Sequence, residues 1–246
     1  GPAVLGPLFP RHGLGEPIAA LDTVLAQAIQ EGRMSLLLER YWGAYLAISR
    51  TEGGLSVLRD PSGFMPCYYL AVGSSLAIAS SVPALVRAGL LRPHLSWDAI
   101  AQILCRGGLP ASFTAIERVQ ELLPGNALHL EAGRLCTTSH WSPWDHVKAE
   151  RAEDPSAWAE PLRRTVDSSV GAWARLFGHV LATVSGGLDS SIVLASARRA
   201  ATRVTSITLS TDDPAGDERS FARQICAHVG SPLVETAYDF ADLDLS

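Results

Sequence analysis

The sequence has 246 residues, a formal net charge of −5 and a hydrophobic content of 47%. Its length exceeds a usual domain of about 100–150 residues, so we expect two domains, or one and part of another. The acidic balance, with Lys148 as the only lysine, argues against a broad nucleic-acid-binding face. Without an apolar run of about 18–20 residues or a signal-like N-terminus, we expect a cytoplasmic protein that binds neither membranes nor nucleic acid.

The first half of the sequence predicts a helix followed by short β-strands. Apolar residues recur at helical spacing within 18–31, which indicates one amphipathic helix. Short β-rich runs separated by turn signals then favour an antiparallel sheet. These runs cover residues 45–49, 54–58, 67–72 and 75–80. Two helices are expected at about 82–89 and 96–105, followed by a hairpin over 127–141.

The second half predicts alternating strands and helices. The polar segment 142–156 has no apolar period and is the best linker candidate. Asp154 and Pro155 are suited to begin a helix, one face of which would carry Trp158, Leu162, Val166, Val170 and Trp173. Strands are then expected at 179–184, 204–210 and 232–236, and helices at 189–201 and 217–229. This alternation predicts a parallel, doubly wound α/β sheet.

The four cysteines are Cys67, Cys105, Cys136 and Cys226. They are far apart in the sequence, and neither a CxxC pair nor a histidine at metal-ligand spacing accompanies them. We therefore expect four buried free thiols.

The stretch VLATVSGGLDSS (180–191) places two glycines between a predicted strand and a helix that begins near Asp189. Ligands of parallel sheets bind at the carboxyl ends of the strands, where the N–H groups of a helix N-terminus suit an anion. Glycines let the backbone approach a phosphate closely, and Ser185, Ser190 and Ser191 add hydroxyl donors. A carboxylate at such a loop requires a cation such as Mg²⁺ between it and the phosphate. Alternatively, Asp189 caps the helix or interacts favourably with its dipole, and the glycines only form a tight turn.

The loop has neither a GK[ST] ending nor a GxGxxG pattern. SGGLDS instead resembles the pyrophosphate loop of the N-type ATP pyrophosphatases. Together with VTSITLS and GDERSFARQICAHVGSPLVE, it resembles asparagine synthetase and its relatives. The resemblance extends through LRDPSGFMPCYYL (58–70), LPGNALHL (123–130) and Trp141.

This resemblance implies a binding site for ATP and Mg²⁺. Four loop residues would hold the pyrophosphate, namely Ser185, Gly186, Gly187 and Ser190. Asp189 would bind Mg²⁺, and backbone near Val184 and Leu209 would contact the adenosine. Asp217 and Glu218 correspond to an acidic pair that often opens the next helix in the family, although a simple charge pair at a helix N-terminus explains them too.

The resemblance also implies a domain organisation. Residues 1–145 would form an α+β, Ntn-type glutaminase-like domain, and residues 146–246 would begin a synthetase domain. The N-terminal cysteine of the family and its RGPD and NGEIYN motifs have no counterparts, so we expect a degenerate domain without glutaminase activity. The synthetase domain of the family is longer, so we expect a truncated domain that is inactive alone, and Lys148 is no replacement for its missing lysine.

The segments GPLFPRHG (6–13) and RYWGAYLAISR (40–50) resemble the opening of lasso peptide macrolactam cyclases. This resemblance implies a ligase that adenylates an Asp or Glu side chain of a precursor peptide, releasing pyrophosphate, for attack by the peptide's N-terminal amine. Its partners would be the precursor peptide, a leader-binding protein and a leader peptidase. Two alternatives stay open: a β-lactam synthetase-like or other related ligase of small molecules, and a non-catalytic scaffold homologue.

Overall fold

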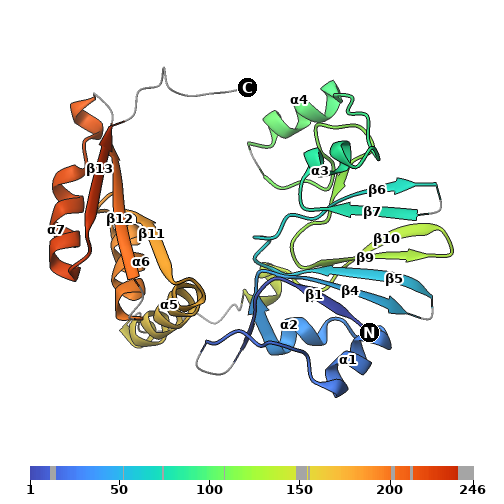
Figure 1. The fold of residues 1–246 in the computed structure, drawn as a ribbon, viewed down its shortest axis with the longest axis horizontal. Coiled ribbons are helices and arrows are strands. Elements are labelled where there is room, and N and C mark those ends of the chain that lie inside the picture. Colours follow the sequence, from blue (N-terminus) through green and yellow to red (C-terminus); the bar gives the residue numbers. More distant parts are fainter. Residues whose placement is uncertain are drawn as a thin grey trace. The chain divides into compact units, whose positions relative to one another are not determined.

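The computed structural model describes residues 1–11, 15–51, 53–73, 75–107, 109–147, 154, 156–200, 203–210 and 213–237. Contacts divide the chain into two compact units (Figure 1). The N-terminal unit comprises Gly1–His12 and Ile18–Ala149, and the C-terminal unit comprises Gly13–Pro17 and Glu150–Ser246. The predicted domain boundary at 145/146 stays a prediction. Residues 148–153, which follow it, lie outside the described part of the chain.

The N-terminal unit is built from antiparallel strands. They are β1 (Ala3–Leu5), β2 (Leu8–Pro10), β3 (Tyr41–Gly43), β4 (Leu46–Thr51), β5 (Gly54–Arg59), β6 (Tyr68–Val72), β7 (Ser75–Ala79), β8 (Gln120–Glu121), β9 (Asn126–Glu131) and β10 (Arg134–Ser139). A five-stranded sheet has the order β1-β4-β5-β9-β10, a three-stranded sheet has the order β7-β6-β8, and β2 pairs with β3. All four predicted strands and the predicted hairpin are confirmed.

The helices of this unit are α1 (Thr23–Gln30), α2 (Leu36–Arg40), α3 (Val82–Arg87) and α4 (Trp97–Cys105), followed by the 3-10 turn η1 (Pro143–His146). The helix predicted over 18–31 begins only at Thr23. The reason is a side-chain cap, since the backbone N–H of Leu25 donates to Oδ1 of Asp22 at 2.8 Å. Ser96 caps α4 as its sequence position suggests, accepting from the N–H of Ala99 at 3.3 Å.

The N-terminal unit is layered as helices, sheet, sheet and helices (Figure 1). Successive residues of β5 serve the two faces of the larger sheet: Leu58 packs with α1 and α2, and Val57 packs toward the smaller sheet. Leu70 of the smaller sheet in turn packs against Leu85 of α3. This alternation follows from the two-residue period of a strand. The layers agree with the expected α+β fold, whereas the Ntn-type assignment stays a prediction.

The segment RDPSG (59–63), which carried part of the family resemblance, has a structural role, and its two charged residues, Arg59 and Asp60, are buried. Arg59 at the end of β5 donates to the Glu121 carboxylate of β8 and to the carbonyl of Gly63. Asp60 accepts from the backbone N–H groups of Tyr45 at 3.0 Å and Ser62 at 2.7 Å. The two charged side chains therefore satisfy backbone groups and join the two sheets.

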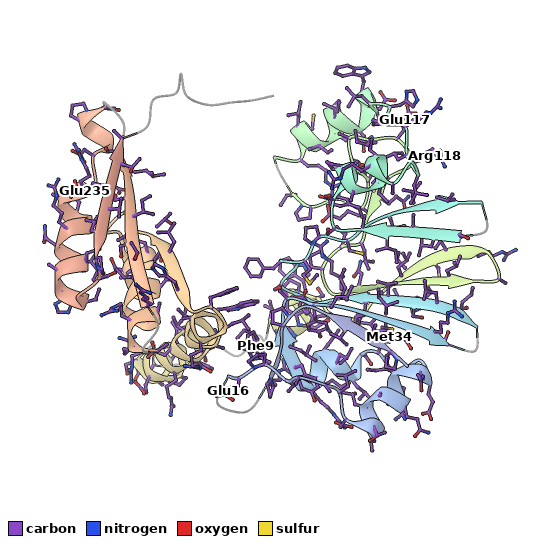
Figure 2. The ribbon with its side chains drawn as sticks, in the orientation of Figure 1. Phe9, Glu16, Met34, Glu117, Arg118 and Glu235 are labelled. Atoms are coloured by element: carbon purple, nitrogen blue, oxygen red, sulfur yellow. The ribbon has the colours of Figure 1, made fainter. Side chains whose placement is uncertain are left out.

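The segment 41–45 also has a packing role. Phe9 of β2, labelled in Figure 2, stacks on Trp42 of β3 with ring centroids 4.7 Å apart. Tyr45 is fully buried in the core next to α1 and α2. Aromatic contacts thus hold β2 and β3 together.

The C-terminal unit follows the predicted alternation closely. Its elements are α5 (Ser156–Leu176), β11 (His179–Thr183), α6 (Leu188–Arg199), β12 (Arg203–Ser210), η2 (Pro214–Gly216), α7 (Arg219–Val229) and β13 (Leu233–Ala237). The three strands are parallel and lie in the order β11-β12-β13. Their predicted bounds are correct to within two residues.

One face of this parallel sheet is covered by the helices. The core beneath them includes Val184, Leu194, Val204 and Cys226. The opposite face carries apolar side chains with large exposed fractions: Leu181 66%, Leu209 50% and Val234 47%. A doubly wound sheet has helices on both faces, and among the described residues only one face is covered, so that detail stays a prediction.

One helix face is more exposed than its apolar pattern suggests, and one expectation about burial is wrong in part. Trp158 and Leu162, which the sequence places on one face of α5, are exposed, and that helix buries Ala172 and Ala174 nearer its end. Cys67 and Cys226 are buried as expected, whereas Cys105 and Cys136 are exposed. Cys105 ends helix α4, and Cys136 lies on β10 at the edge of its sheet. No helix of the described residues has both the length and the apolar character needed to cross a membrane.

Candidate functional site

The SGGLDS loop connects β11 to α6 at the carboxyl edge of the parallel sheet. The backbone N–H of Val184 donates to the carbonyl of Ile207 at 2.9 Å, which continues the pairing of β11 with β12 one residue past the strand. Val184 is buried, and the chain leaves the sheet at Ser185. The loop therefore begins where ligands of parallel sheets bind.

The two glycines of the loop have different roles. Gly186 has φ +83°, and a β-carbon there would lie 2.4 Å from Cβ of Phe221 and 2.8 Å from the backbone nitrogen of Ala222. Only glycine fits this position, because the loop lies directly against the first turn of α7. Gly187 is the N-cap of α6 with φ −69°, and its β-carbon would meet only Ser185 Oγ, at 3.3 Å.

Two serine hydroxyls form hydrogen bonds within the loop. Ser185 Oγ accepts from the N–H of Gly187 at 3.2 Å and lies 3.2 Å from Ser190 Oγ. Ser190 Oγ also donates to the carbonyl of Gly187 at 3.3 Å. Because no side chain caps the N-terminus of α6, its first-turn N–H groups are free of a side-chain acceptor. Hydroxyls and helix N–H groups together form a set of donors that fits a phosphate.

A cavity of about 240 Å³ lies beside this loop. Its lining comprises Thr183, Val184, Ser185, Ser190, Ile207, Thr208, Leu209 and Glu218. Four predicted site residues thus line one cavity: Val184, Ser185, Ser190 and Leu209. Gly186, Gly187 and Asp189 are not among the lining residues; the first two shape the loop and Asp189 lies in the first turn of α6.

Asp189 is exposed and does not cap the helix, because Gly187 occupies the N-cap position. The structure therefore excludes the capping alternative, whereas the position of Asp189 in the first turn of α6 agrees with a favourable interaction with the helix dipole. No group of three or more histidine, cysteine, aspartate or glutamate side chains suited to a metal occurs among the described residues. A Mg²⁺ ion at Asp189 would complete its shell with phosphate oxygens and water, as this ion commonly does. The uncapped helix end, the hydroxyls and the Asp189 carboxylate fit a magnesium-bound phosphate.

The acidic pair at the start of α7 divides into two environments. Asp217 receives two hydrogen bonds from the guanidinium of Arg219, Nε to Oδ1 at 2.8 Å and Nη2 to Oδ2 at 2.7 Å. These bonds lower the pKa of Asp217 to about 2. Glu218 instead lines the cavity. From the sequence, Asp217 and Glu218 look alike. The arginine two residues after Asp217 is the one sequence feature that indicates a neutralised Asp217 carboxylate.

A larger cavity, of about 850 Å³, is lined by residues of α5, α6 and α7. Apolar side chains such as Leu162, Val166 and Ile192 contribute to it, along with Arg199, which pairs with Asp167. Ser191, expected to add a hydroxyl donor to the phosphate site, lines this cavity and not the smaller one, whereas the other predicted site residues do not line it. The residues that line the smaller cavity, and not the volume of a cavity, therefore identify the candidate site. Lys148 lies outside the described residues.

Two family models match the chain. The model described as asparagine synthase matches residues 161–244, and the model described as glutamine amidotransferase domain matches residues 21–141. The two matches support the asparagine synthetase family. The matched ranges contain the SGGLDS loop and most of the N-terminal unit, respectively.

Solved structures give a weaker likeness. Glutamine phosphoribosylpyrophosphate amidotransferase from B. subtilis, complexed with ADP and GMP, has 11% identity over 96% of this chain, with a TM-score of 0.37. The allosteric regulatory enzyme of purine biosynthesis has 13% identity over 89%, with a TM-score of 0.34. The chain spans 61% and 55% of those two chains. Likenesses at these TM-scores assign neither fold nor function, and no curated protein matches the chain.

Proposed function

We propose that this chain supplies the nucleotide-binding part of a ligase that uses ATP and Mg²⁺, releases AMP and pyrophosphate, and closes a macrolactam ring in a precursor peptide. The observation that carries the proposal is the SGGLDS loop, which combines an uncapped helix N-terminus, two hydroxyls and an exposed carboxylate beside one cavity. The match to the asparagine synthase model supports the same chemistry.

Each loop residue has a role in this proposal. Hydroxyls of Ser185 and Ser190 and the first N–H groups of α6 bind the pyrophosphate, Gly186 and Gly187 let the backbone approach it, and Asp189 holds Mg²⁺. Mg²⁺ supplies charge neutralisation for the phosphates. Backbone at Val184 and Leu209 borders the adenosine.

The reaction requires that the loop hold the pyrophosphate as it departs. A carboxylate oxygen of the substrate attacks the α-phosphorus, and pyrophosphate leaves. The peptide's N-terminal amine then attacks the carbonyl carbon, and AMP leaves. Donors fixed before the reaction stabilise the charge that develops on the leaving group, and holding both reactants together lowers the entropic barrier.

The opening segments of the chain favour a peptide as the substrate, as in the lasso cyclases they resemble. The N-terminal unit then takes no part in hydrolysing glutamine, since the glutamine-binding motifs RGPD and NGEIYN have no counterparts in it. We propose that the enzyme acts in the cytoplasm. It acts after a leader peptidase and a leader-binding protein have exposed the amine of the precursor peptide.

The test is a product assay with the full-length protein, MgATP and the trimmed core peptide. We expect AMP, pyrophosphate and a peptide product one water lighter that resists unthreading. Asp189→Asn should abolish turnover without changing the circular dichroism spectrum, because this side chain is exposed. ADP and phosphate as products would contradict the proposal. Activity on a small β-amino acid with none on the peptide would instead favour a β-lactam synthetase-like ligase.

A further inference from the structure

Glu218 lies next to the turn of α7 that packs against the phosphate loop. Its carbonyl accepts from the backbone N–H groups of Phe221 and Ala222, each at 3.1 Å. These are the two residues against which Gly186 packs. Glu218 also lines the cavity that Ser185 and Ser190 line.

The Glu218 carboxylate is free to bind a ligand. It makes no capping hydrogen bond to α7, and no hydrogen bond or ion pair joins it to another described residue. Its acidic neighbours differ in this respect. Asp217 is held by Arg219, and Glu235 on β13, labelled in Figure 2, accepts from Nε and Nη2 of Arg223 at 2.7 and 2.6 Å.

The chemistry of a nucleotide limits what this carboxylate can recognise. An ionised carboxylate is negatively charged, so it repels the phosphates. It also only accepts hydrogen bonds, so its partner on the nucleotide must be a donor. With the phosphates on the loop, the nearest donors are the hydroxyls of the ribose, which joins the α-phosphate directly; the amino group of adenine lies further away. In dinucleotide-binding sheets, an acidic residue after the neighbouring strand accepts from the ribose in the same way. Glu218 follows β12, the strand next to β11.

We propose that Glu218 accepts hydrogen bonds from the ribose hydroxyls of the nucleotide and makes the site selective for ribonucleotides over deoxyribonucleotides. This inference rests on the proposed function, which sets the phosphates at the loop. It adds a specificity determinant that the loop does not provide, because the loop contacts concern phosphate and metal alone.

The test compares nucleotide affinities by titration calorimetry of the full-length protein with Mg²⁺ and no peptide. The ligands are ATP, 2′-deoxy-ATP, 3′-deoxy-ATP and inosine triphosphate. The unsubstituted protein should bind at least one deoxy analogue about tenfold or more weaker than ATP, the effect of losing a hydrogen bond to a charged group. Glu218→Ala should bind ATP and that analogue equally, and Glu218→Gln, which keeps an acceptor oxygen, should lie between.

Asp217→Ala is the matched control, since its carboxylate is engaged by Arg219, and it should keep the preference for ATP. Retention of the preference in Glu218→Ala, with ATP still bound, would overturn this inference alone. If Glu218→Ala lost affinity equally for all nucleotides and excess Mg²⁺ restored that affinity, Glu218 would be assigned to the metal. That result would also overturn the inference. Loss of discrimination against inosine triphosphate only would assign Glu218 to the base and overturn the ribose contact too. No binding of any nucleotide by the unsubstituted protein would overturn the proposed function as well.

Discussion

Nη1 of Arg59 and Oε1 of Glu121 lie 2.8 Å apart, with only 4% of the arginine side chain and 28% of the glutamate side chain exposed. The pair joins the end of β5 in the larger sheet to β8 in the smaller one. Arg59 also donates to the carbonyls of Leu122 and Gly63. One side chain therefore satisfies three acceptors from two segments of the N-terminal unit.

Replacing Arg59 by methionine should destabilise this unit strongly, because the Glu121 carboxylate and two carbonyls lose their donor. We expect the free energy of unfolding to fall by about 3 kcal/mol, the lower end of the cost of breaking a buried pair, since Glu121 is partly exposed. Urea unfolding followed by tryptophan fluorescence measures the change. Arg33→Ala, which removes an exposed pair with Glu31, is the control and should leave the free energy of unfolding almost unchanged. Equal losses in the two variants would refute the assignment.

The two loop glycines should respond differently to alanine. Gly186→Ala introduces a β-carbon 2.4 Å from Cβ of Phe221 at a positive φ, so it should lower the free energy of unfolding by about 2–4 kcal/mol and displace α7. Gly187→Ala has φ −69° and only a 3.3 Å contact with Ser185 Oγ, and it should stay within about 1 kcal/mol. Thermal unfolding of the two variants makes the comparison. A larger loss of stability in Gly187→Ala than in Gly186→Ala would contradict these two roles.

Asp217 should titrate far below an ordinary aspartate. Hydrogen bonds from the Arg219 side chain and backbone lower its pKa from 3.8 to about 2. Because the folded-state pKa lies below the unfolded value, this contact stabilises the protein above pH 3.8, and its contribution is lost as pH falls toward 2. Carbon-13 NMR of the carboxyl group should give a midpoint near 2.

Arg219→Ala should raise the Asp217 midpoint from about 2 toward 3.8 without reaching it, because the backbone N–H of residue 219 still donates to Oδ1 of Asp217. Arg223→Ala is the matched control, because the guanidinium of Arg223 hydrogen-bonds Glu235 and not Asp217. In that control the pKa of Asp217 should stay well below its ordinary value. An ordinary midpoint in the unsubstituted protein would show that the pair with Arg219 does not persist in solution.

The four cysteines should separate into two reactive and two protected thiols. Cys105 and Cys136 are exposed and Cys67 and Cys226 are buried. Burial raises the pKa of Cys67 to about 11, which keeps this thiol protonated and unreactive near neutral pH. Ellman's reagent should label two thiols in the folded protein and all four in denaturant. The double variant Cys105→Ser/Cys136→Ser should show no rapid labelling, and rapid labelling of Cys67 would contradict the buried assignment.

The parts of the fold that can be predicted best from sequence have strong local signals. The strands and helices from His179 onward alternate with turn residues, and their periods alone locate them. The strands β1, β2 and β3 and the helix α2 have no such signal and were not predicted. They are short, and β1 depends on pairing with β4, for example Ala3 opposite Ile48, which no local pattern indicates.

The candidate site shows the same division. The SGGLDS loop is contiguous, so its glycines, hydroxyls and carboxylate could be interpreted together from sequence. Glu218 enters the cavity only because the first turn of α7 packs against Gly186, a contact between distant parts of the chain. Likewise, the apolar period of α5 predicts a helix face but not that Trp158 and Leu162 remain exposed on it.

The face of the parallel sheet that the described residues leave uncovered affects the thermodynamics of unfolding. Leu181, Leu209 and Val234 already contact water to about half or more of their surface in the folded protein, so unfolding adds little apolar hydration there. The heat capacity increment of unfolding and the denaturant sensitivity both scale with newly exposed surface. The C-terminal unit should therefore contribute less of each, per residue, than the N-terminal unit, whose larger sheet is packed on both faces.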